Sequence, residues 1–314
     1  MRKSNCVSVV VTAYNCGARI APTLESVFAQ TLNPSEVIVV DDGSTDETFQ
    51  WIETHYTTRL RLIHQENAGV AKARNRGLQE VTGDFVAFLD HDDIWMPEKL
   101  ELQLQKMLSS PRLGVVYCSW NRVSSSDGEI LENGKTRLAN PLIRWPEGRV
   151  FGALLKNNII IYVSVPLIKT QKLRDIGGFD SLTVPSDDWD LWLRLAKKTE
   201  FGFVPEVLLN YMHSQGQQST DANKMRISKN RIFWKHKFSL PLHPKAVFVY
   251  ATTNYFSQTI HPFYNQIRLH ISAGEWSLAR GLLWKTWKKF PFLFLCPQWV
   301  YAALRIFRRD NRVF

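Results

Sequence analysis

The sequence Phe85-Val-Ala-Phe-Leu-Asp-His-Asp-Asp93 places an apolar run directly before a group of acidic residues. An apolar run of this length predicts a buried strand, and strands of open α/β sheets bind ligands at their carboxyl ends. Asp90, Asp92 and Asp93 would repel one another there unless a cation neutralised them. Carboxylates suit Mg²⁺ or Mn²⁺, which are commonly held together with substrate phosphates. The stretch therefore indicates a metal–diphosphate site, with a solvated acidic turn as the alternative.

Strand-like and helix-like segments alternate around this stretch. Apolar runs that predict strands occur at residues 7–11, 36–40, 60–64, 85–89, 114–118 and 159–165. Helical spacing of apolar residues marks the segments 18–30, 70–79 and 97–107. This alternation predicts an α/β fold with a mostly parallel central sheet flanked by helices. Neither a Gly-x-Gly-x-x-Gly after the first strand nor a P-loop sequence occurs, which disfavours dinucleotide-dependent oxidoreductases and P-loop nucleoside triphosphatases.

Four segments occur in order along the first half of the chain. They are Val9-Val-Val-Thr-Ala-Tyr-Asn15, Val37-Ile-Val-Val-Asp-Asp-Gly-Ser-Thr-Asp-Glu-Thr48, Asn67-Ala-Gly-Val-Ala-Lys-Ala-Arg-Asn-Arg-Gly77 and Phe88-Leu-Asp-His-Asp-Asp-Ile-Trp95. Together they resemble the nucleotide-binding half of the inverting family 2 glycosyltransferases, which have the GT-A fold. The resemblance extends from residue 7 to about residue 213 and implies a metal-dependent enzyme that uses a nucleotide-sugar, UDP-linked in our expectation.

The resemblance implies a set of donor-binding residues. The set comprises Thr12, Ala13, Tyr14, Asp42, Lys72, Arg74 and Asp90. Residues 12–14 would line the base and ribose, and Asp42 would accept a hydrogen bond from a uracil-like N–H. Asp90 would hold the ribose, and the permanently charged, forked guanidinium of Arg74 would meet the base or the phosphates. Solvated positions on one helix remain the alternative for Lys72 and Arg76.

The resemblance also implies where the metal, Mn²⁺ or Mg²⁺, would bind. Asp92 would bind the ion that bridges the diphosphate, with Asp93 alongside. His213 follows a predicted strand and would complete the site, although a lone histidine is more often structural. We interpret His91 as a filler, because the family usually has a small residue at this position.

The segment Pro185-Ser-Asp-Asp-Trp-Asp-Leu-Trp-Leu-Arg194 resembles the acidic pair and amphipathic helix of the same family. Asp188 is the candidate general base, because inverting transfer is a direct displacement and the attacking hydroxyl must lose its proton. The family usually has Glu-Asp where this chain has Asp187-Asp188. The alternative is that both acids only oppose the helix dipole, as we expect for Asp190. Trp189 could stack on an acceptor sugar or simply pack.

The basic charge is concentrated in the last third of the chain. The net charge is +10, yet residues 1–219 carry 23 Lys and Arg against 26 Asp and Glu. Residues 220–314 carry 16 Lys and Arg and three Asp and Glu, among many aromatic residues. This pattern is typical of interfacial helices on anionic lipid; the alternative is a helical arm that packs on the core or a partner. Nucleic acid is disfavoured because no binding signature for it occurs.

We therefore expect a GT-A catalytic domain in residues 1–220 and a helical, basic and aromatic region in residues 221–314. The first would comprise a nucleotide-sugar-binding half, 1–118, and an acceptor-binding half, 119–220. Scattered cysteines and the lack of a signal sequence favour the cytoplasm, at the inner face of the membrane. The expected acceptor is a glycan or lipid-linked precursor of cell-surface polysaccharide. One alternative is a nucleotide-sugar or glycan-binding protein without turnover. A second is a nucleotidyltransferase, but the sequence has no glycine-rich, basic triphosphate loop near the first strand, which such an enzyme would need.

Overall fold

The strand β1 (Val7–Ala13) is buried along its whole length and lies at the centre of the first half of the sheet. It pairs in parallel with β2 (Glu36–Asp41) on one side and with β4 (Phe85–Asp90) on the other, and β2 pairs in parallel with β3 (Arg61–His64). The register sets Thr12 opposite Asp90, so the polar residues that follow these strands share one edge. The parallel arrangement predicted for this half is confirmed.

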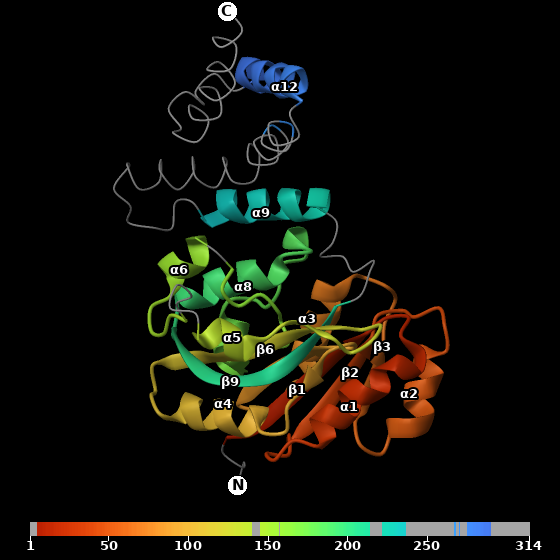
Figure 1. Ribbon diagram of the computed structural model, residues 1–314. Helices are drawn as coiled ribbons and strands as arrows, with labels where there is room; N and C mark the ends of the chain where they lie inside the picture. The colour runs from red at the N-terminus through yellow and green to blue at the C-terminus, as the bar shows by residue number, and fades with distance from the viewer. Residues whose placement is uncertain are drawn as a thin grey trace, which may run out of the picture. The chain divides into compact units, whose positions relative to one another are not determined.

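Helices cover both faces of this parallel region (Figure 1). They are η1 (Gly17–Ile20), α1 (Ala21–Phe28), α2 (Thr48–Tyr56) and α3 (Val70–Glu80). Helix α3 packs closely on β1, because a Cβ atom at Gly77 would lie only 2.3 Å from Cγ1 of Val10. This close approach fixes the helix that carries Arg74 against the strand that carries Thr12.

The second half of the sheet is mixed in direction. The described strands form one nine-stranded sheet in the order β3-β2-β1-β4-β8-β6-β9-β5, and β7 pairs with β6. The added strands are β5 (Ile94–Trp95), β6 (Leu113–Ser124), β7 (Ile130–Glu132), β8 (Leu167–Lys169) and β9 (Glu200–His213). The short strand β8 runs antiparallel to both of its neighbours, whereas β6 and β9 are parallel to each other.

The prediction of a strand at residues 159–165 is wrong. These residues form an irregular segment, and the strand β8 begins after them, at Leu167. Three of its apolar residues, Ile160, Val163 and Val165, are nevertheless buried. An apolar run reports burial but not backbone pairing. Gln103 of α4 (Lys99–Leu108) holds the segment, since its amide donates to the carbonyls of Val116 (3.0 Å) and Val165 (2.9 Å).

Short helices complete this half. They are α5 (Gly134–Ala139), α6 (Phe151–Lys156), α7 (Thr170–Asp175), η2 (Ser181–Thr183) and α8 (Asp187–Ala196). Helix α8 carries the acidic pair, Asp187 and Asp188, in its first turn. Its Trp189 is buried and donates from Nε1 to the carbonyl of Leu154 over 2.7 Å, so it packs in the protein and does not present its ring to a ligand.

The computed structural model describes residues 5–139, 145–156, 158–213, 222–236, 267, 270 and 275–289. The chain divides into two compact units, Met1–His236 and Lys237–Phe314. Helix α9 (Ala222–His236), which its composition groups with the basic region, belongs to the first unit, and α12 (Trp276–Lys289) belongs to the second. Within the described ranges, none of the helices combines the length and apolar composition needed to cross a bilayer. The polar run 215–220 and the apolar run 290–307 lie outside the described residues.

Candidate active site

The guanidinium of Arg74 lies between two carboxylates from distant parts of the chain. Its Nη2 atom donates to both carboxylate oxygens of Asp90, at 2.8 and 3.0 Å, and its Nη1 atom donates to Oδ2 of Asp187 at 2.9 Å. Arg74 is only 6% exposed and Asp187 is 3% exposed, so the ion pair between them is shielded from water. Removing either partner of such a pair would destabilise the fold, because a buried charge without a partner has a high free energy. Arg74 therefore connects the donor motifs to the acidic pair.

Asp188 is the next residue along helix α8 and is half-buried. Its Oδ1 accepts from the backbone N–H of Trp189 at 2.6 Å, and its Oδ2 lies 3.5 Å from Nδ2 of Asn158. Burial, together with the charge of Asp187, raises the pKa of Asp188 to about 8. A carboxylate with a pKa near neutrality can both accept and release a proton under working conditions. These properties suit the general base predicted at this position.

Asp42 organises the loop that precedes helix α3. Its Oδ1 accepts from the side chain of Gln65 (2.6 Å) and the backbone of Ala68 (2.9 Å), and its Oδ2 accepts from the backbone of Gly69 (2.9 Å). It is 5% exposed. The described contacts of Asp42 therefore hold the Asn67-Ala-Gly69 loop in place, and its predicted contact with a base stays a prediction.

The other predicted donor residues differ in their exposure. Thr12 and Ala13 are buried, and the hydroxyl of Thr12 lies 3.3 Å from Oδ1 of Asp90. Tyr14 is 44% exposed at the carboxyl edge of the sheet, where a ring can meet a planar base. Lys72 is exposed on α3 and lines an open groove that also includes Arg76. Its exposure suits either a ligand or solvent, the two alternatives drawn from the sequence.

Asp93 has a different environment from its acidic neighbours. It is fully buried, and its carboxylate accepts hydrogen bonds from the hydroxyl of Ser164 (2.5 Å) and the backbone N–H of Met212 (3.2 Å). Burial, and then the charges of Asp92 and Asp90, raise the pKa of Asp93 well above its usual range. This arrangement favours a role in positioning the strand ends over the metal-ligand role that the sequence suggested.

Asp92 and His213 are the sequence neighbours of Asp93 and Met212, the two residues joined by this hydrogen bond. Asp92 directly precedes Asp93 and is half-buried, and His213 directly follows Met212 at the end of β9. The hydrogen bond from Met212 to Asp93 thus brings the two predicted metal-binding segments together. No cluster of three or more His, Cys, Asp or Glu side chains with metal-binding geometry is present among the described residues. The backbone of His91 accepts a hydrogen bond from Thr23 (2.9 Å), and its role as a filler stays a prediction.

Comparisons with known proteins agree with this architecture. The family model described as "Glycosyl transferase family 2" matches residues 8–161. The chain is also 30% identical over 226 residues to an Escherichia coli protein named UDP-Glc:alpha-D-GlcNAc-diphosphoundecaprenol beta-1,3-glucosyltransferase WfgD. That match covers 72% of this chain and 83% of the relative. This chain belongs to glycosyl transferase family 2.

Two longer relatives match only in part. The chain is 27% identical to the chondroitin synthase of Escherichia coli over 74% of its own length, and it spans 32% of that protein. It is 29% identical to the hyaluronan synthase of Pasteurella multocida over 72% of its length, and it spans 22% of that protein. The chain thus spans about a third or less of these two relatives.

Solved structures share the fold. TarS 1–349 of S. aureus in complex with UDP-GlcNAc superposes with a TM-score of 0.59 at 20% identity, covering 81% of this chain and 76% of that one. The mannosyltransferase PcManGT of Pyrobaculum calidifontis, in complex with GDP-Man and Mn²⁺, has a TM-score of 0.60 at 19% identity, covering 96% and 84% of the two chains. The predicted GT-A fold is therefore confirmed.

Several residues of the site were missed by sequence reasoning. Asp187 appeared only as a weak match to a family Glu, yet it is the direct partner of Arg74. Ser164 lies in an irregular segment; its hydroxyl donates to Asp93 and accepts from the backbone of Asp90 (3.2 Å). Asn75 of the third family 2 motif exchanges two hydrogen bonds of 2.8 Å with the backbone of Phe179. Their contacts all span long sequence separations, which no local pattern reveals.

Proposed function

We propose that this family 2 protein is an inverting glycosyltransferase. It transfers a sugar from a nucleotide diphosphate donor, UDP-linked, to a glycan or lipid-linked acceptor of cell-surface polysaccharide. The contact of Arg74 with both Asp90 and Asp187 carries this proposal, because it joins the donor motifs to the acidic pair. The names of a relative that uses UDP-Glc and of a neighbour bound to UDP-GlcNAc support the choice of donor.

The transfer is a single displacement in this proposal. The acceptor hydroxyl oxygen attacks the anomeric carbon while the bond from that carbon to the diphosphate oxygen breaks, and the hydroxyl proton passes to the carboxylate of Asp188. Asp187, which pairs with Arg74, lies beside it in the sequence, and its negative charge opposes the ionisation of Asp188. The burial that raises the pKa of Asp188 therefore makes its carboxylate a stronger base than an exposed one.

A divalent cation, Mn²⁺ or Mg²⁺, is part of the proposal. Asp92 and His213 would hold it together with the donor diphosphate, since Mg²⁺-type ions are commonly bound by one or two protein carboxylates plus phosphates. The charges of Asp92 and Asp90 raise the pKa of Asp93, and a bound cation would reduce the repulsion among these three carboxylates. The bound ion would neutralise charge on the leaving diphosphate. A neighbour of this fold, the mannosyltransferase, is described in complex with Mn²⁺.

We place the enzyme at the inner, cytoplasmic face of the cell membrane as a peripheral protein. Helix α12 carries Arg280 and Lys285 beside Leu278 and Trp284, both more than half exposed. Basic and aromatic residues on one helix are typical of segments that lie at the surface of anionic lipid. A relative whose name includes a diphosphoundecaprenol acceptor fits a substrate at that surface.

The direct test is consumption of nucleotide-sugars by the full chain with Mn²⁺ or Mg²⁺. A panel of UDP- and GDP-sugars is offered with short glycans and with a polyprenyl-diphosphate sugar, and release of the nucleoside diphosphate is measured. Transfer from a UDP-sugar with inversion at the anomeric carbon is the expected result. Tight UDP binding without turnover on any acceptor would instead indicate a binding protein.

A further inference from the structure

Helix α9 contacts residues on both sides of the acidic pair, Asp187 and Asp188, in the sequence. The Nζ atom of Lys235 lies 2.6 Å from Oδ2 of Asp180 and 2.9 Å from Oδ1 of Asp190. Asp180 lies seven residues before Asp187, and Asp190 lies two residues after Asp188. A single ammonium group therefore closes the segment 180–190, which contains the acidic pair, across its two ends.

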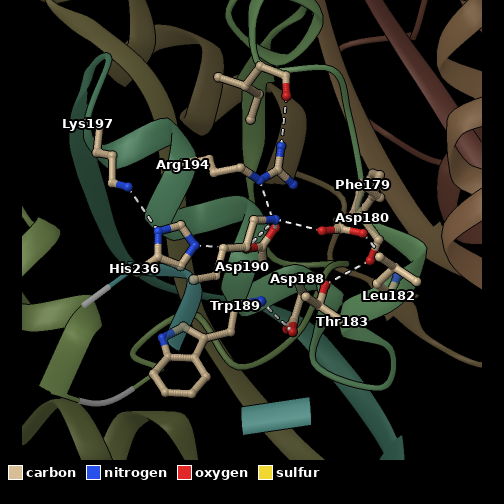
Figure 2. A network of polar contacts seen from close by, with 12 residues as sticks. Phe179, Asp180, Leu182, Thr183, Asp188, Trp189, Asp190, Arg194, Lys197 and His236 are labelled. Carbon is tan, nitrogen blue, oxygen red and sulfur yellow. Dashed lines mark hydrogen bonds and ion pairs between the residues drawn. The ribbon is translucent and has the colours of Figure 1, made fainter. Parts of the chain in front are cut away.

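His236, the last residue of the same helix, makes a second contact to Asp190. Its Nε2 atom lies 2.8 Å from Oδ1 of Asp190, and its Nδ1 atom lies 2.9 Å from Nζ of Lys197 (Figure 2). The Lys197 ammonium can only donate, so Nδ1 accepts and the ring proton is on Nε2, facing the carboxylate. Burial lowers the pKa of His236 and favours this neutral form. The tautomer is thus determined by the neighbours on both sides.

Backbone contacts reinforce the attachment of α9 to the residues before the acidic pair. The hydroxyl of Ser228, which is buried, donates to the carbonyl of Thr183, and the guanidinium of Arg231 donates to the carbonyl of Leu182. Both carbonyls belong to η2, the turn that leads into α8. Helix α9 therefore contacts two parts of this region. It bonds to η2, which leads into α8, and to the carboxylate of Asp190 in the first turn of α8.

We propose that Lys235 and His236 are positioning residues for the base, acting on Asp188 through Asp190 and Asp180. The proposal rests on the function proposed for Asp188 above. Asp188 and Asp190 share the first turn of α8 (Figure 2), so a shift of Asp190 moves the base with it. Displacement of a reacting group by about 1 Å can lower a rate by about 10²-fold.

Arg194 makes it possible to separate positioning from folding. Its Nε atom donates to Oδ2 of Asp190 at 2.7 Å from within α8 itself. When Lys235 is replaced, the buried carboxylate of Asp190 therefore keeps one cation, and the costly state of an unpaired buried charge is avoided. Loss of Lys235 removes the ion-pair bridge between Asp190 and Asp180, while Asp190 keeps its contacts with Arg194 of α8 and His236 of α9.

The experiment compares Lys235→Met with Lys235→Arg, and His236→Leu with His236→Gln, in the full chain. Arg keeps the charge, and the side-chain amide of Gln can donate where Nε2 does. Lys229→Met is the matched control, because Lys229 lies on the same helix and makes no hydrogen bond or ion pair to Asp180 or Asp190 in the part of the chain described. Transfer kcat, KM for donor and acceptor, UDP affinity and the thermal midpoint are measured for each protein.

We expect Lys235→Met and His236→Leu to lower kcat about 10-fold or more, with UDP affinity within about twofold of wild type. Lys235→Arg and His236→Gln should recover most of the rate, and Lys229→Met should behave as wild type. Wild-type kcat in Lys235→Met and His236→Leu would overturn the positioning role while leaving the transferase proposal intact. The positioning role would also be overturned if kcat fell only in proportion to the fraction of protein that no longer binds UDP. Absence of transfer by the wild-type chain would overturn the proposed function itself.

Discussion

The Nη1 atom of Arg74 donates a hydrogen bond to Oδ2 of Asp187 over 2.9 Å, joining residues that lie 113 positions apart in the sequence. Both side chains are almost entirely buried, and the same guanidinium also holds Asp90 at the end of β4. This contact sets the distance between the strand ends that would bind the donor and the helix that carries Asp188. Arg74 is thus a structural connection across the candidate site, and the donor contact predicted for it from the sequence stays a prediction.

Replacing Arg74 should destabilise the fold as well as abolish transfer. Arg74→Leu leaves Asp187 buried without its partner, and breaking a buried ion pair in this way costs about 3–5 kcal/mol. Arg74→Lys should also be impaired, because one ammonium cannot reproduce the forked contacts. Free energies of unfolding from urea titration test this. Arg76→Leu, which removes a half-exposed pair with Glu80, should cost no more than about 0.5 kcal/mol; equal losses for both would contradict the assignment.

Asp188→Asn should abolish transfer without loss of stability. The amide oxygen can still accept from the N–H of Trp189 but cannot take a proton from the acceptor. Because burial raises the pKa of Asp188 to about 8, its ionised form is the disfavoured one in the folded protein. Above that pH, the neutral Asn should therefore give an equal or higher free energy of unfolding. Transfer assays and urea titrations at pH 9 measure both effects, and retention of wild-type kcat would exclude Asp188 as the base.

The rate should rise with pH through the pKa of the base. Below about pH 8 the carboxyl of Asp188 is mostly protonated and cannot accept the acceptor proton; above it the carboxylate is available. We expect kcat/KM for the acceptor to increase about tenfold per pH unit on the acidic side and to level off near pH 8. A profile that is flat from pH 6 to 9, measured with saturating metal, would assign proton removal to another group.

Chelation and substitution of Asp92 should affect transfer in the same way. Treatment with EDTA should abolish turnover, and added Mn²⁺ should restore it. Asp92→Ala should lower kcat/KM about 10²-fold or more, because interactions that stabilise developing charge contribute on this scale. Asp127→Ala, in an exposed turn between β6 and β7, is the control and should change nothing. Full activity of the Asp92→Ala protein at low Mn²⁺ would remove this residue from the metal site.

Binding to anionic vesicles should depend on the basic charge of the C-terminal region. Reversal of Lys285, Lys288 and Lys289 to Glu should greatly weaken flotation with phosphatidylserine-containing liposomes, since each basic residue near such a surface contributes about 1 kcal/mol. Reversal of Arg149, Lys172 and Lys198 in the first unit is the control for net charge. If both triple variants lose binding equally, the surface contact is not specific to this region.

The sequence predicted which residues lie at the strand ends, but it did not predict which residues contact them. The strand ends at Thr12, Asp42 and Asp90 follow from alternating apolar runs, since parallel strands must bring their carboxyl ends to one edge. The partners of those residues did not follow from any pattern. Asp93 lies one residue from Asp92, yet it is buried against Ser164 and Met212, 71 and 119 positions away. Sequence proximity alone made Asp92 and Asp93 look equivalent.

The alternation of strands and helices, the family and the positions of the acidic clusters could all be read from the sequence, because they depend on local periodicity and short motifs. The pairing of the carboxylates could be seen only in the folded chain. Arg74 is bound to Asp90 and Asp187, and Asp190 is bound to Lys235 and His236 of a helix that composition had grouped with the basic region. Burial and ion pairing depend on distances in space between residues far apart in the chain, and no local pattern encodes those distances.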